Sequence, residues 1–359
     1  MNKKEVYESI VSSFATKHSW LGEQVATEFL LSVATWNIQH YQRPEFRIAS
    51  NKLFYWDRGW IKSSLMHMLY NLLDDRLAIM ITDITRPAFR GSVEETSSGA
   101  QFVPPLPALY PFIFIAELGS ITMKKDEIVQ EMLETMESGY GSTRLIKNAR
   151  LSDVDRKNIT DQWPWIKFKD SATITYKADA VYFGATYKAG YITDEAFAER
   201  FEAIIPNQPL TSQLTKWSDR HGFVIDQEAK AKLNEYIAAP AQALPEPNLP
   251  DSLYDKDKFM SHRLARNIRA YIMAKQWWGF KTDNEEAFDR YQKMKEGQKR
   301  IAMYESDKIA EFLKQHGKAT LEEIETELRI PISKIRKDLH EHIDAKKIVE
   351  NGVVYYTLL

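Results

Sequence analysis

The segment that most constrains this chain is a strand–loop–helix unit near residue 60. Residues 52–55 form a short apolar run typical of a strand, and residues 64–73 form a run typical of a helix. The loop between them has the sequence Trp56-Asp57-Arg58-Gly59-Trp60-Ile61-Lys62-Ser63. Because a helix N-terminus presents free backbone N–H groups to an anion, this layout is that of a phosphate-binding loop. Lys62 would then reach the outer phosphates, and the Ser63 hydroxyl would bind Mg²⁺.

The loop departs from the usual phosphate-loop pattern, G-x-x-x-x-G-K-[ST], at both of its glycines. Trp56 stands at the first glycine position and Ile61 at the second. Glycine allows the backbone to turn tightly and to approach phosphate closely, and both of these residues work against that. The alternative interpretation is an ordinary strand-to-helix turn with a surface lysine.

Composition limits the classes of protein to which the chain can belong. Its 359 residues allow two or three domains, and 44% hydrophobic with 27% charged residues is an ordinary globular balance. The absence of cysteine excludes disulfides and thiolate metal sites, and a net charge of −2 means that any nucleic-acid site must be local. Without a long apolar run or an apolar N-terminal leader, we expect a cytoplasmic protein that is not bound to a membrane.

The pattern of apolar runs predicts an α/β fold with a parallel sheet. Residues 3–42 favour two helices, and residues 45–205 alternate between strand-like and helix-like segments. Buried strands are expected at 77–83, 110–117 and 180–186. Glu117 ends the second of these, at the carboxyl edge where open α/β sheets bind ligands. An acidic residue just past a strand is also commonplace.

Residues 142–169 combine seven basic residues with three aspartates and three aromatic residues, Trp163, Trp165 and Phe168. Cations bind a nucleic-acid backbone, and exposed aromatic rings stack on bases. The alternative is a solvated hairpin whose aromatic side chains pack on their own sheet.

The end of the chain predicts a small separate domain. Residues 306–316, 321–328 and 331–344 favour three helices, and 348–356 favour a hairpin with an Asn351-Gly352 turn. This order is typical of a winged helix, whose third helix would present Ser333, Lys334, Arg336 and Lys337 to DNA. Over 305–359 nine Lys and Arg face eleven Asp and Glu, so docking to a protein remains the alternative.

The order and spacing of these segments over about residues 45–275 resemble AAA+ ATPases of the branch with a hairpin before the sensor strand. That branch includes the minichromosome maintenance helicases and the magnesium chelatases. The loop keeps the Asp, inner Gly, Lys and Ser of the family's Gly-Asp-Pro-Gly-x-Ala-Lys-Ser motif. The family's strand ending in Asp-Glu corresponds to one that ends in Ala116-Glu117, without the aspartate associated with Mg²⁺.

Further family features follow in the same order. A helix ending in Met136-Glu137-Ser138-Gly139 precedes the basic segment, as in the family. Thr186 stands where the sensor strand usually has Asn, Arg200 matches the arginine finger, and Arg266 matches the sensor arginine of the helical lid.

The resemblance implies an AAA+ P-loop ATPase core with a helical lid, an N-terminal helical segment and a C-terminal winged-helix domain. The expected boundaries are 1–43, 44–205, 206–303 and 304–359. ATP and Mg²⁺ are the implied cofactors. Their implied ligands are Asp57, Gly59, Lys62, Ser63, Ser64 and Arg266, with Ser63 on the metal.

The same resemblance implies a homo-oligomeric ring, with a hexamer as the expected size, that acts on DNA as a helicase-like or replication and initiation motor. Glu117 would activate water, Thr186 would sense the nucleotide, and Arg200 would act on a neighbouring subunit. DNA would contact Arg144, Lys147, Arg150, Lys167, Lys169, Lys334, Arg336 and Lys337. Two other functions stay open: a nucleotide-gated DNA-binding assembly protein without hydrolysis, and a remodeller of protein complexes.

Overall fold

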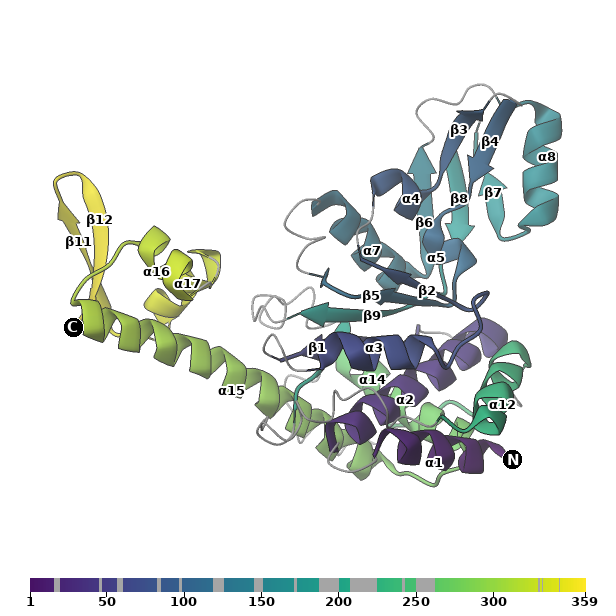
Figure 1. Cartoon of the computed structure of the whole chain (residues 1–359), viewed down its shortest axis with the longest axis horizontal. Helices are drawn as coiled ribbons and strands as arrows, with labels where there is room; N and C mark the ends of the chain where they lie inside the picture. Colours follow the sequence, from purple (N-terminus) through teal and green to yellow (C-terminus); the bar gives the residue numbers. More distant parts are fainter. Residues whose placement is uncertain are drawn as a thin grey trace.

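A five-stranded parallel sheet lies at the centre of the fold, as the sequence predicted (Figure 1). Its strands are fully or mostly buried apolar runs, because helices cover both faces of the sheet. The computed structural model describes residues 1–15, 20–44, 47–56, 61–82, 85–96, 99–118, 126–144, 151–170, 173–186, 200–206, 225–240, 243–249, 262–328, 330, 332–341 and 343–359. In spatial order the strands are β10 (Phe201–Ile204), β1 (Asn51–Tyr55), β9 (Val181–Thr186), β5 (Phe112–Ile115) and β2 (Ala78–Ile81).

Helices from both ends of the sequence cover one face of this sheet. The ring of Phe29 lies 5.4 Å from that of Phe183 on the sheet, and Trp278 donates its indole N–H to the Leu30 carbonyl at 2.8 Å. The expected N-terminal segment and the expected lid therefore form one layer with a common core, rather than two separate domains. This layer contains α1 (Lys3–Phe14), α2 (Trp20–Gln42), α3 (Lys62–Tyr70), α12 (Gln227–Ala238) and α14 (His262–Trp277).

The other face is covered mainly by α7 (Asp126–Ser138), with the short helices α4 (Arg86–Arg90) and α5 (Leu106–Leu109) nearby. Met132 and Met136 of α7 lie in one apolar cluster with Ile113 and Tyr182 of the sheet. The helix ends at Gly139, whose φ of +71° is the left-handed conformation expected of a helix-terminating glycine.

An accessory subdomain extends from this second face (Figure 1). It holds a ribbon of β3 (Ser92–Thr96) and β4 (Gly99–Val103), helix α8 (Asp153–Gln162), and a sheet ordered β6 (Tyr140–Arg144), β8 (Thr173–Lys177), β7 (Ile166–Phe168). We call this three-stranded antiparallel sheet the accessory sheet. The simple hairpin expected over 142–169 was therefore wrong: β6 pairs with β8, and α8 is inserted before β7.

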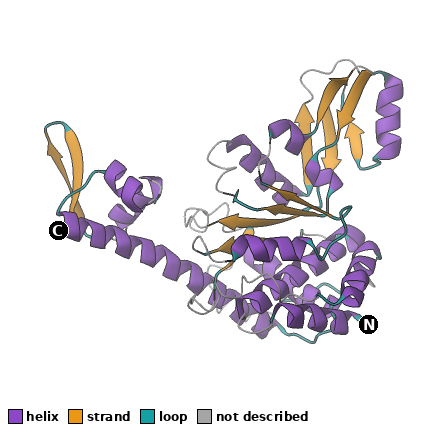
Figure 2. Ribbon diagram, viewed as in Figure 1, coloured by secondary structure: helices purple, strands orange, loops and turns teal. Residues whose placement is uncertain are grey.

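A 33-residue helix, α15 (Asn284–His316), leads from the main body to the C-terminal unit (Figure 2). It runs unbroken through the boundary expected at 303 and 304. The unit continues with α16 (Leu321–Leu328), α17 (Ile332–Glu341), β11 (Ala345–Glu350) and β12 (Val353–Leu358). The structure confirms the three helices and the hairpin, with Asn351 and Gly352 both at positive φ in its turn. None of the described helices is both long and apolar enough to cross a lipid bilayer.

One buried ion pair lies inside the C-terminal unit. The ammonium of Lys334 bonds the carboxylate of Asp338 one turn later on α17, and Asp338 is fully buried. Lys334 itself is only 8% exposed, so its ammonium pairs with Asp338 on the same helix instead of facing solvent.

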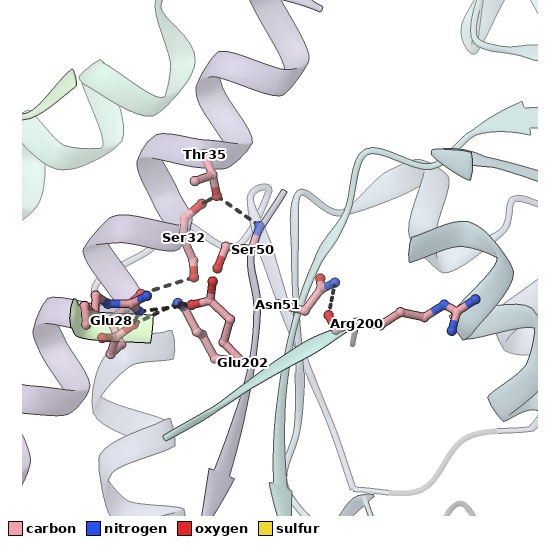
Figure 3. Close-up of polar contacts among 9 residues, drawn as sticks. Glu28, Ser32, Thr35, Ser50, Asn51, Arg200 and Glu202 are labelled. Atoms are coloured by element: carbon pink, nitrogen blue, oxygen red, sulfur yellow. Dashed lines mark hydrogen bonds and ion pairs between the residues drawn. The ribbon is translucent and has the colours of Figure 1, made fainter. Parts of the chain in front are cut away.

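A second, larger charge network joins the helical layer to the sheet (Figure 3). Glu28 of α2 accepts from Lys52 of β1 at 2.7 Å and from Arg290 of α15 at 2.6 Å. Glu202 of β10 also bonds both cations, with Arg290 at 3.0 Å. Lys52 is 1% exposed, so the network holds two cations and two carboxylates in a nearly dry site.

The network keeps its carboxylates ionised. Burial by itself would raise the pKa of Glu202, but the charges of Lys52 and Arg290 outweigh this and lower it to about 2. Arg290 and Lys52 likewise hold the pKa of Glu28 below its ordinary value, against the effect of burial.

Replacing Glu202 by Gln should destabilise the fold by about 3–5 kcal/mol, because two buried cations would share one carboxylate. Chemical denaturation of the full chain measures this loss. The matched control is Glu235→Gln, which removes an exposed partner of Lys232 and should change stability by about 1 kcal/mol or less. Equal effects of the two changes would contradict the role given to the network.

Stability should also fall with acid in a defined window. A carboxylate whose pKa is lowered on folding stabilises the fold fully above its unfolded value, here 4.5. That contribution is lost as the pH falls from there toward about 2. Melting temperatures between pH 6 and pH 3 should drop more steeply for the wild type than for Glu202→Gln, and parallel curves would refute this explanation.

Lys334→Ala should unfold the C-terminal unit, because it leaves the Asp338 carboxylate buried without a cation at a cost of about 3–5 kcal/mol. Hydrogen exchange at the α17 amides measures the local loss. Lys337→Ala is the control: Lys337 is exposed and only weakly paired with Glu341 at 3.9 Å, so exchange should change little. Unchanged exchange in Lys334→Ala would show that the buried pair does not hold this unit together.

Candidate functional site

The carboxyl ends of β1 and β9 meet at the switch point of the sheet. From β1 the chain passes through α3 to β2, at the far edge, whereas β5 leads through α7 and the accessory sheet back to its neighbour β9. Helices α3 and α7 lie on opposite faces of the sheet (Figure 1). Ligands of open α/β sheets bind in the crevice outside such a point, which is where the predicted phosphate-binding loop begins.

Lys62 closes this crevice from the first turn of α3. Its ammonium donates to the Trp56 carbonyl at 2.5 Å and to the Thr186 carbonyl at 2.8 Å. Tyr55 and Thr186 are register partners, so Lys62 binds the ends of two neighbouring strands. The structure thus brings the predicted Lys62 and Thr186 together, although through a backbone oxygen of Thr186 rather than its hydroxyl.

The residue before α3 adopts a strained backbone conformation that a glycine would adopt without strain. Ile61 has a φ of +36°, a left-handed conformation that a β-branched side chain rarely adopts. It also gives the helix no side-chain cap. The first N–H groups of α3 therefore have no side-chain acceptor at the cap position, which is the arrangement that attracts an anion.

Trp56, at the other glycine position, belongs to the core. It is 4% exposed, and its ring lies 6.1 Å from that of Phe54. The Lys62 ammonium also lies 5.6 Å from the centre of the Trp56 ring, a cation–π arrangement that favours the positive charge here. An indole therefore occupies the position at which the usual loop has a glycine.

The other residues expected around a nucleotide lie as follows. Ser63 and Ser64 are exposed on the first turn of α3, while Asp57 and Gly59 lie outside the described residues. Glu117 is half-buried just past β5, at the same carboxyl edge as Lys62. Among the described residues no group of three His, Asp or Glu side chains is placed to hold a metal ion.

The predicted Arg200 lies toward the opposite edge of the sheet. It precedes β10 at its amino end, where its carbonyl accepts from Asn51 (Figure 3). Its guanidinium lies 3.4 Å from Glu137. Arg47 bonds the carbonyls of Ala178 and Ala180, just before β9.

Burial lowers the pKa of Arg47, and the cation of Arg266 on α14 acts in the same direction. Arg200, paired with Glu137 at the amino end of β10, lies away from Lys62 within one chain.

The residues expected on DNA fall into three groups. Arg144, Lys167 and Lys169 are exposed on or beside the strands of the accessory sheet, and Arg336 and Lys337 are exposed on α17. Lys147 and Arg150 lie outside the described residues. The expectation for Lys334 was wrong: its ammonium is buried against Asp338 and cannot reach a phosphate.

Sequence inspection missed Tyr140, which is the more exposed of the two aromatic side chains that project from the accessory sheet. Its alternation with Ser142 and Arg144 along β6 is the signal that could have identified it.

Comparison with known proteins adds no assignment. No protein-family model matches the chain, and no curated protein matches it significantly.

Proposed function

We propose that this chain is an ATP-dependent, DNA-acting protein that resembles AAA+ ATPases, with its nucleotide at the carboxyl ends of β1 and β9. The observation that carries the proposal is the Lys62 ammonium, held at the switch point by the carbonyls of Trp56 and Thr186. A buried cation beside an uncapped helix N-terminus suits the phosphates of a nucleotide.

Lys62 would act as a latch between two strand ends. In the structure its ammonium ties β1 to β9 through backbone oxygens. Phosphate oxygens compete better for an ammonium than neutral carbonyls do, because phosphate carries a negative charge that attracts the ammonium directly. Binding would therefore release both strand ends, with Ser63 as the Mg²⁺ ligand and Glu117 positioned to polarise a water molecule.

The position of Arg200 supports action between subunits. It lies at the amino edge of β10, away from Lys62, so a nucleotide bound at Lys62 would need this arginine from a neighbouring copy. In a ring, each Arg200 would exchange Glu137 for the nucleotide of the adjacent subunit. Hydrolysis of MgATP to ADP and phosphate would supply the free energy for motion along DNA.

A second function, nucleotide-gated DNA binding without hydrolysis, is favoured by two observations. Trp56 is packed into the core where the usual loop is open, and Ala116 replaces the aspartate that helps to position Mg²⁺. Both features weaken the placement of the metal, and metal positioning dominates phosphoryl-transfer catalysis.

Lys62→Ala should abolish nucleotide binding. At MgATP concentrations about 100-fold above Kd, the wild type should gain about 2.7 kcal/mol of stability, measured as a rise in melting temperature. The variant should melt lower without nucleotide, because the latch is lost, and should show no rise with MgATP. His67→Ala, exposed on the same helix, should keep the full rise.

Turnover separates the two functions. In the motor, phosphate release should depend on DNA and should disappear in Glu117→Gln, which keeps the MgATP-dependent rise in melting temperature. If the wild type binds MgATP without releasing phosphate, the second function, nucleotide-gated DNA binding without hydrolysis, is supported. If MgATP does not stabilise the wild type at all, both functions are refuted.

A further inference from the structure

The accessory sheet has one covered face and one open face. Register partners on neighbouring strands point to the same side, so Ile174, Tyr176 and Ile166 share the face that packs on β3, β4 and α8. Gly141 belongs to this face too, and the ring of Tyr176 fills the place of its missing side chain. Trp163 and Phe168, expected to contact bases, pack partly into this same core.

The open face is organised in three rows across the strands. Tyr140 pairs with Lys177, whose N–H donates to the Trp165 carbonyl at 3.1 Å, so an aromatic side chain stands at each end of the first row. The alternation of the strands sets the other two rows at about 7 Å intervals. The rows are Tyr140–Lys177–Trp165, Ser142–Thr175–Lys167 and Arg144–Thr173–Lys169.

The open face combines exposed aromatic rings with cations. Tyr140 is 64% exposed and Trp165 is 41% exposed, which is unusual for large aromatic side chains on a sheet. Of the nine side chains, those of Arg144, Lys167, Lys169 and Lys177 are cationic, and none is acidic. Lys177 is paired with Asp179, which leaves three exposed cations beside two exposed rings.

We propose that this open face is a platform for single-stranded DNA, on which Tyr140 and Trp165 stack on bases while Arg144, Lys167 and Lys169 bind the backbone. The inference deepens the proposed function by naming the form of DNA, but it does not require a working nucleotide site. The two rings stand about 10 Å apart, two strand spacings, so they meet different bases of one strand.

The combination of rings and cations selects an unpaired strand. In a duplex the faces of the bases are stacked on each other and cannot reach an aromatic side chain, whereas in a single strand they can. Cations alone would hold duplex and single strands alike through phosphate. The positive charge of the face also disfavours a basic partner, because like charges would face each other across the interface.

The test is fluorescence anisotropy of a labelled oligo(dT) of about 16 nucleotides with the full chain, without nucleotide. Tyr140→Ala and Trp165→Ala should each weaken binding about 5- to 150-fold, while Tyr140→Phe and Trp165→Phe should restore most of it. Arg144→Ala and Lys167→Ala should each lower the slope of log affinity against log salt by about 0.7. Lys157→Ala, on α8 away from this face, is the charge-matched control and should change neither quantity.

Three outcomes would overturn the platform: binding of a duplex as tight as of oligo(dT), tighter binding of oligo(U) than of oligo(dT), or wild-type affinity in Tyr140→Ala and Trp165→Ala. Lys62→Ala should still bind oligo(dT). Stabilisation by MgATP without single-strand binding would therefore refute this inference alone, and the reverse result would refute only the nucleotide site.

Discussion

The arrangement of the main body depends on the charge network of Lys52, Glu28, Glu202 and Arg290. Burying the charges of Lys52 and Glu202 is tolerable only if each finds its partners, so the network constrains how α2 and α15 pack against β1 and β10. Lys52 lies at the amino end of β1, and the candidate nucleotide crevice lies at the carboxyl end of the same short strand. The network thereby fixes one end of the strand whose other end Lys62 ties to β9.

The two edges of the sheet, at the carboxyl and amino ends of its strands, hold different groups. The carboxyl edge holds Lys62, Thr186 and Glu117, whereas the amino edge attaches the accessory sheet. There Arg47 bonds Ala178 and Ala180, and its guanidinium lies 2.7 Å from where a side chain on Gly139 would begin. Because any larger residue would displace Arg47, both connections to the accessory sheet are held by one cation.

Much of the fold could be predicted because its signals are local. The parallel strands are short apolar runs. The start of α16 is capped by Thr320 and Glu323, and the side chain of each accepts a hydrogen bond from the backbone N–H of the other. Gly317 and Asn351-Gly352 adopt positive φ where the sequence predicted a helix end and a tight turn. The accessory sheet was not predicted, since its central strand β8 comes last in the sequence and pairs with β6 across α8. Such non-local pairing leaves no periodic signal in any short window.

The sequence by itself determined the parallel strands, the main helices that flank them, the helices and hairpin of the C-terminal unit, and the identity of Lys62 as the cation at the start of α3. Only the tertiary structure decided what each side chain faces. Lys334 and Arg336 are two residues apart on one helix, yet the first is buried against Asp338 and the second is exposed. Trp56 fills the core while Trp165 and Tyr140 face solvent. The physical reason is that burial depends on which elements pack together in space, and residue type limits that choice without making it.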